Sequence, residues 1–156
     1  MRYSIQSILY TSDLTPRSPM VFRHAVGLAQ RFEADLHGVS VIRPGIGLPH
    51  DDLSEEHLEQ IRASHNPAEE LFRRRINTFD IAHPEYEVHK YMRSVRVLDG
   101  DPAKVILETA KELQADLIVM GSRGHNVMEE LILGSVSHKV MLKTTIPVVL
   151  VPFDRE

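Results

Sequence analysis

The 156-residue chain is 42% hydrophobic and 26% charged, which predicts a single globular domain over residues 1–156 with its own core. A formal net charge of −4 without a basic face argues against nucleic acid as a partner, and the absence of cysteine excludes disulfides and thiolate sites. No apolar run is long enough to span a membrane and no leader segment precedes the first predicted strand, so we expect a cytoplasmic protein with no membrane partner.

Strand and helix signals alternate along the chain, beginning with a strand over residues 5–10. The polar residues 12–19 predict a turn and a helix start, with Ser, Thr and Asp as cap candidates and an early proline. The helix that follows is predicted to bury one face, because these apolar residues recur at helical spacing: Phe22, Ala25, Val26, Ala29 and Phe32. A second strand is predicted over 36–42, and a loop with two glycines and two prolines over 43–52.

A long polar helical region is predicted over residues 53–80, and Asn66-Pro67 should break or kink it. Its possible core contacts are Leu58, Ile61, Leu71, Ile76 and Phe79. Within it, the run Arg73-Arg74-Arg75 follows Glu69 and Glu70 at four-residue spacing, which favours ion pairs on a solvated helix face. We therefore interpret the arginine run as surface. The role of residues 43–67 stays open, since they could cover a bound base or contact a partner.

The second half of the chain continues the alternation, with its weakest strand pattern over residues 91–98. Asp101 and Pro102 predict the N-cap and first position of a helix whose buried stripe is Val105, Ile106, Ala110 and Leu113. Strands over 116–120 and 146–151 complete the set, with a helix over 136–142 between them. This pattern predicts an α/β fold with one open five-stranded parallel sheet and helices on both faces.

A glycine-rich segment follows the fourth predicted strand: Gly121-Ser122-Arg123-Gly124, nine residues, then Gly134-Ser135 and a helix. Glycine lets the backbone approach an anion closely, and the exposed N–H groups at a helix start can then donate to it. A strand that ends in glycines before a helix is where α/β folds bind phosphate, so the chain is predicted to bind a nucleotide. Neither the P-loop nor the dinucleotide fingerprint occurs.

The spacing G-x2-G-x9-G-S resembles that of the nucleotide-binding subgroup of the universal stress protein (UspA-like) family. Further blocks occur in the family's order: Ile8-Leu9-Tyr10-Thr11-Ser12-Asp13, Gly100-Asp101-Pro102, Asp116-Leu117-Ile118-Val119-Met120-Gly121, Gly134-Ser135-Val136-Ser137 and Ile146-Pro147-Val148-Val149. The resemblance covers the whole chain. It implies a Rossmann-like sheet with strand order 3-2-1-4-5 and an ATP-binding regulatory protein of the stress response, in which nucleotide acts as a conformational or assembly switch.

The resemblance also implies a role for each matching residue. Asp13 would lie beside the adenine and ribose or a metal, with helix capping as a compatible second role, and Val41 would give an apolar wall and a backbone contact for the adenine. Met120 and Gly121 would flank the base and ribose. The expected phosphate-side residues are Arg123, Gly124, His125, Gly134, Ser135 and Val136. The ligand would be ATP, ADP or AMP, and Mg²⁺ or Mn²⁺ held through the phosphates would strengthen binding; no protein metal ligands are predicted.

Two other functions stay in view. No catalytic motif occurs, so we predict no catalytic residues and at most slow ATP hydrolysis. The alternative is an adenine-nucleotide hydrolase or nucleotidyl-transfer enzyme on the same fold, whose usual Ser-Gly-Gly loop or H-x-G-H motif is absent. A dimeric scaffold without nucleotide would not need the glycine set.

The last predicted strand bears on assembly. An apolar strand at an uncovered sheet edge invites aggregation, so we predict a homodimer through residues 147–151. The sequence does not identify the protein partner that would respond to the nucleotide state.

Overall fold

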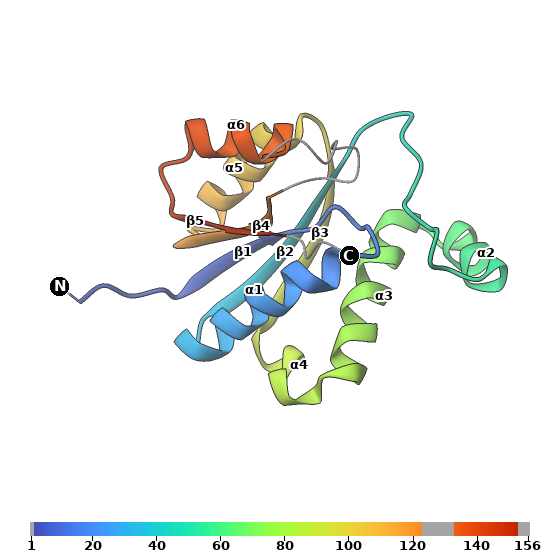
Figure 1. The fold of residues 1–156 in the computed structure, drawn as a ribbon, viewed down its shortest axis with the longest axis horizontal. Coiled ribbons are helices and arrows are strands. Elements are labelled where there is room, and N and C mark those ends of the chain that lie inside the picture. The colour runs from blue at the N-terminus through green and yellow to red at the C-terminus, as the bar shows by residue number, and fades with distance from the viewer. Residues whose placement is uncertain (1, 123–132, 153–156) are drawn as a thin grey trace.

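Five parallel strands form one sheet in the order β3-β2-β1-β4-β5 in the computed structural model of the chain, which describes residues 2–122 and 133–152 (Figure 1). The strands are β1 Ser7–Thr11, β2 Asp35–Ile42, β3 Met92–Asp99, β4 Leu117–Gly121 and β5 Val148–Val151. The predicted strand order is confirmed, and each predicted strand end lies within two residues of the observed one.

Helices cover both faces of the sheet, as predicted (Figure 1). One face packs against α1 (Ser18–Phe32), α3 (Pro67–Ala82) and the short α4 (Val88–Tyr91), which follows a 3₁₀ turn, η1 (Pro84–Tyr86). The other face packs against α5 (Pro102–Glu112) and α6 (Ser135–Lys143). Helix α2 (Glu55–Ala63) lies beside α3 at the far side of the molecule from the N-terminus. None of the described helices is long and apolar enough to cross a membrane.

The larger core lies under α1 and α3 and contains an aromatic cluster. The ring centroid of Tyr10 lies 5.2 Å from that of Phe22 and 6.1 Å from that of Phe72. Gly38 permits this packing, because a Cβ there would come within 2.9 Å of the Phe72 ring. The Tyr10 hydroxyl donates to the Ser18 carbonyl at 3.1 Å, and burial raises the pKa of this phenol well above its ordinary range.

One predicted core residue is exposed, and two members of the stripe predicted for α5, Val105 and Leu113, are only partly buried. Phe32 is 45% exposed, whereas the other four residues of its predicted stripe are buried. The helix ends at Phe32 because Glu33 takes a left-handed conformation, with φ 53°. The N–H of Ala34 then donates to the Ala29 carbonyl at 2.9 Å, and Ala34 is buried in place of Phe32.

Caps were predicted for two helix starts, and the structure confirms one of them. Asp101 accepts from the N–H of Lys104 at 3.2 Å and Asn66 from that of Glu69 at 3.1 Å, so the start of α5 and the predicted break between α2 and α3 are confirmed. The expected cap of α1 is corrected. Its N-cap is Arg17, which makes no side-chain cap hydrogen bond, because the candidate cap residues Ser12 and Asp13 instead close turns upstream.

Candidate functional site: a cavity at the carboxyl ends of the strands

A cavity of about 250 Å³ lies at the carboxyl ends of β1, β2 and β4. The chain leaves β1 toward β2 and β3 on one side and later returns to β4 and β5 on the other, so a crevice forms where the order reverses. Seven segments line the cavity: residues 10–14 at the end of β1 and directly after it, Ser18 and Val21 of α1, 40–43 at the end of β2, 46–49 of the following loop, Pro102 and Ile106 of α5, Met120 and Gly121 of β4, and 135–137 of α6.

All but one of the described residues in the predicted nucleotide site line this cavity: Asp13, Val41, Met120, Gly121, Ser135 and Val136. The remaining one, Gly134, directly precedes the lining residues of α6. Arg123, Gly124 and His125 lie outside the described residues. Met120 is buried, whereas Val41 is half-buried, because its side chain packs on the core beneath α5 and also borders the cavity.

Asp13 is fixed by a turn after β1. Its Oδ1 accepts from the N–H of Thr15 at 3.0 Å and from the Thr15 hydroxyl at 2.8 Å. The preceding Ser12 hydroxyl oxygen accepts from the N–H of Leu14 at 3.0 Å, and Leu14 has a φ of 63°, an uncommon value for a leucine. The turn therefore holds the carboxylate of a half-buried Asp13 at the cavity wall with Oδ2 outside these bonds.

The start of α6 supplies N–H groups to the opposite wall. The N–H groups of the first helical residues, Ser135 and Val136, have no acceptor within the helix. The N–H of Gly134 donates to the Ser122 carbonyl at 2.8 Å, which corrects its expected role as a phosphate donor. The buried Ser137 hydroxyl donates to the Gly121 carbonyl at 2.8 Å and thereby fixes α6 to the end of β4.

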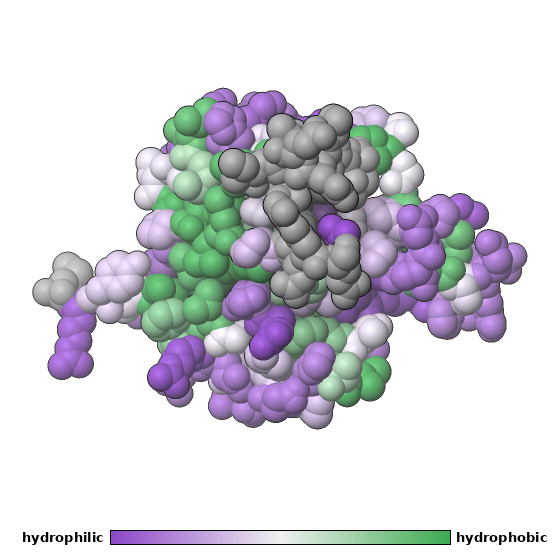
Figure 2. Space-filling view, viewed as in Figure 1, coloured by the Kyte–Doolittle hydropathy of each residue, from purple (hydrophilic) through white to green (hydrophobic). Residues whose placement is uncertain are grey.

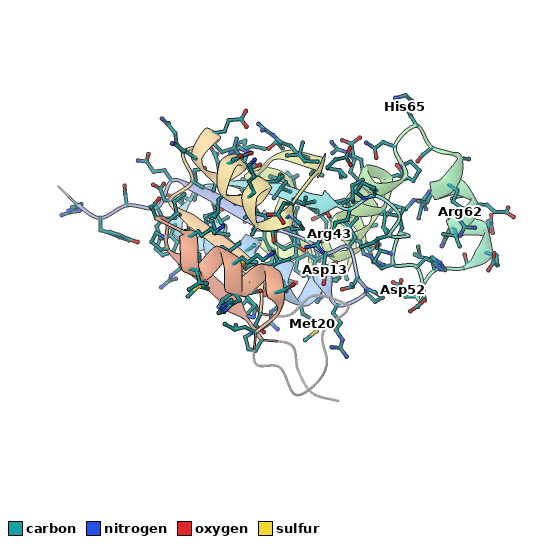
Figure 3. The ribbon with its side chains drawn as sticks, turned by 90° about the horizontal axis from the view of Figure 1, so that it is seen from above. Asp13, Met20, Arg43, Asp52, Arg62 and His65 are labelled. Atoms are coloured by element: carbon teal, nitrogen blue, oxygen red, sulfur yellow. The ribbon has the colours of Figure 1, made fainter. Side chains whose placement is uncertain are left out.

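The described wall carries one charged group of each sign, the carboxylate of Asp13 and the guanidinium of Arg43 (Figure 3). Arg43 is exposed, so its charge is at the mouth of the cavity. Within residues 2–122 and 133–152, no group of three acidic or histidine side chains is arranged to hold a metal ion. The rest of the described wall is mainly apolar and is suited to a flat organic group.

Residues 43–52, whose role the sequence left open, contribute Arg43, Ile46, Gly47, Leu48 and Pro49 to the cavity wall. They are held by Arg75, which sequence reasoning missed. Its guanidinium forms a bidentate ion pair with Asp52, and its Nε donates to the Leu14 carbonyl at 3.2 Å. The hydrogen bonds from Arg75 lower the pKa of the Asp52 carboxyl.

The predicted solvated face is therefore corrected for Arg75, while Arg73 and Arg74 pair with Glu69 and Glu70 as expected. The sequence did contain a pattern that indicates burial of Arg75. Arg75 lies three or four residues from Leu71, Phe72 and Phe79, so it belongs to the apolar stripe that α3 buries. A charged residue on such a stripe needs a partner for its charge, and the loop supplies one in Asp52, whose side chain is 38% exposed.

The sequence and the fold each match known proteins. The model of the universal stress protein family matches residues 4–152. Universal stress protein MJ0531 of Methanocaldococcus jannaschii is 28% identical over 148 residues, which are 94% of this chain and 81% of that protein. Two relatives from Bacillus subtilis align over only 34–36% of either chain.

Solved structures share the fold. A universal stress protein in complex with cAMP superposes with a TM-score of 0.65 at 19% identity, over 96% of this chain and 98% of that one. The universal stress protein of Archaeoglobus fulgidus in complex with dAMP gives 0.58 at 22% identity, over the same shares of the two chains. At these identities the likeness shows a common UspA-like α/β architecture.

Proposed function

Because this chain belongs to the universal stress protein family, we propose that it binds an adenine nucleotide in the cavity between Asp13 and the start of α6. ATP is the expected ligand, with ADP and AMP as the alternatives. The bound nucleotide would act as a conformational or assembly switch in a cytoplasmic stress-response protein that requires no catalytic residues. Mg²⁺ or Mn²⁺ would be held through the phosphates.

One observation carries this proposal. Six residues predicted to contact the nucleotide come from four different segments, and the fold brings them to one cavity at the carboxyl ends of the strands. Two proteins of the same fold were solved with cAMP and with dAMP, which supports an adenine ligand class. The apolar wall fits the base, and the N–H groups at the start of α6, which have no acceptor within the helix, fit a phosphate.

The direct test is to purify the protein without added nucleotide, denature it and identify the released small molecules by mass spectrometry. ATP at about one per chain would support the proposal. ADP or AMP, together with turnover of added ATP, would favour the adenine-nucleotide enzyme instead. A protein that releases nothing and takes up no ATP with Mg²⁺ or Mn²⁺ would overturn the nucleotide site and leave a scaffold.

A substitution at Ser135 tests the phosphate contact. Proline is compatible with the first helical position, and the preceding Gly134 has φ −71° and ψ 163°, which suits a residue before proline. Ser135→Pro therefore removes an N–H while the helix persists. By calorimetry, we expect about ten- to hundredfold weaker ATP binding and unchanged adenosine binding.

Ser135→Ala is the matched control, because it removes the hydroxyl but keeps the N–H. Equal losses in the two variants would assign the contact to the hydroxyl. ATP affinity that is unchanged in Ser135→Pro would place the phosphates away from the start of α6.

We also propose a homodimer through β5. This strand is at one edge of the sheet, and Val148, Val149 and Leu150 are only partly buried. Figure 2 shows an apolar area over β5 that extends toward α6, where Met141 and Leu142 are exposed. The opposite edge, β3, carries Arg93 and Arg96 on its edge strand, which disfavours pairing. A second copy of the chain is the partner that suits the β5 edge.

A further inference from the structure

We propose that Arg75 is a positioning residue of the nucleotide site: it fastens the loop wall formed by residues 46–52 to the turn that carries Asp13, and so slows nucleotide release. The inference rests on the proposed function for its ligand. The arrangement of the wall around Arg75, however, can be tested without nucleotide.

Arg75 reaches two segments that are distant in the sequence. On one side it pairs with both carboxylate oxygens of Asp52 and donates to the Pro49 carbonyl at 3.4 Å. On the other side it donates to the Leu14 carbonyl at 3.2 Å. Pro49 and Leu14 both line the cavity, so one side chain connects two parts of its wall.

The burial of Arg75 sets it apart from its neighbours. Its side chain is 10% exposed, against 57% for Arg73 and 34% for Arg74. Four acceptor atoms, from three residues on two segments, fit the planar, five-donor guanidinium, and the single ammonium group of a lysine could not reproduce that fork. In Figure 3, Asp52 projects between Asp13 and the α2 end of the molecule.

The loop wall has few other attachments. Residues 43–53 contain no helix or strand, and their backbone hydrogen bonds are short turns, from Ile46 to Arg43 and from Leu53 to His50. Leu48 and Leu53 pack against the larger core. Among the described residues, the hydrogen bonds that join residues 44–53 to the rest of the fold all come from Arg75.

Arg75 also stabilises the turn of Asp13. Leu14 has a φ of 63°, a left-handed conformation that is unfavourable for a residue with a side chain. This conformation coincides with a hydrogen bond from Arg75 to the carbonyl of Leu14, one residue after Asp13. Loss of Arg75 would therefore relax the turn and the loop together, and both flank the predicted position of the base.

The test compares Arg75→Gln with Arg74→Gln. The control removes an arginine from the same helix that pairs with Glu70 and Gln60 and does not line the cavity. In the nucleotide-free protein, hydrogen exchange of peptides covering residues 12–16 and 43–54 should accelerate about tenfold in Arg75→Gln and stay unchanged in Arg74→Gln. Dissociation of a fluorescent ATP analogue, measured by stopped flow, should accelerate about tenfold in Arg75→Gln alone.

Asp52→Ala keeps the experiment decisive if Arg75→Gln fails to fold, because Asp52 is at the exposed end of the pair. It should accelerate hydrogen exchange in the peptides covering residues 43–54 and dissociation of the ATP analogue, whereas the peptides covering residues 12–16 should change less, because the hydrogen bond from Arg75 to the Leu14 carbonyl remains. Unchanged exchange in the loop peptides, or equal acceleration in Arg74→Gln, would overturn the role of Arg75. If the unmodified protein bound no ATP, the proposed function would fail, while hydrogen exchange would still decide whether Arg75 holds the wall.

Discussion

His37, on β2, is a histidine whose pKa the fold lowers. Its Nδ1 lies 2.7 Å from the Ser94 hydroxyl oxygen on the neighbouring strand β3. Burial lowers the pKa of His37; Arg96 and Arg93 lower it further, and Asp35 opposes them. Protonation of this ring is therefore easier in the unfolded chain than in the folded one.

The sign of the pH dependence follows. Above the unfolded pKa of about 6.5, His37 is neutral in both states and costs nothing. As the pH falls from there toward the lowered folded pKa, the unfolded state binds more protons and the free energy of unfolding decreases. We expect His37→Gln to lose less stability than the unmodified protein between pH 7.5 and pH 5, as measured by urea unfolding. Parallel losses in the two proteins would show that other groups control this range.

Helix α5 depends on its N-cap. Asp101 accepts from the N–H of Lys104, and the side chains of Pro102 and Ile106 behind it line the cavity. Asp101→Ala should lower the free energy of unfolding by about 1 kcal/mol, because one N–H of the first turn loses its acceptor. Chemical denaturation measures this loss. Asp101→Ser keeps an acceptor and should recover most of it, so equal destabilisation in both variants would contradict a capping role.

The edge strand β5 determines how two copies of the whole molecule could pair. Pro147 and Val151 accept hydrogen bonds from β4 through their carbonyls, to Ile118 and Ser122. Backbone groups alternate along a parallel strand, so those of Val148 and Leu150 point away from β4 toward the open edge. Pairing with a second copy would use these outward groups.

A proline at Leu150 tests this pairing. Leu150→Pro removes an outward N–H and leaves the bonds to β4, a position at which an edge strand tolerates proline. Sedimentation at tens of micromolar should show a dimer for the unmodified protein and a monomer for Leu150→Pro, since a stable dimer has a Kd of about 1 μM or tighter. Leu150→Ala, which keeps the N–H, should stay dimeric. A monomeric unmodified protein would reject the homodimer.

Local patterns in the sequence predicted much of this molecule. Hydrophobic periodicity predicted the five strands and the buried face of each main helix, since burial of one face imposes a period of two or 3.6 residues. The Asp101 cap was predictable because a cap bonds within its own turn, and the break at Asn66-Pro67 because proline disfavours a helical conformation in the residue before it. The spacing of the glycines and the resemblance it supports indicated the residues that line the cavity.

Contacts between distant segments were decided only by the tertiary structure. Arg75 has the local pattern of a surface arginine, yet its partners lie 23 and 61 residues away. The N–H of Gly134 is occupied by Ser122, and no periodicity encodes that bond across the glycine-rich segment. Phe32 fits its helical stripe but is the last residue of the helix, where the chain turns away at Glu33. The physical reason is common to all three. Tertiary packing determines which distant group pairs with a polar group and where the buried face of a helix ends, and the local sequence does not encode that packing.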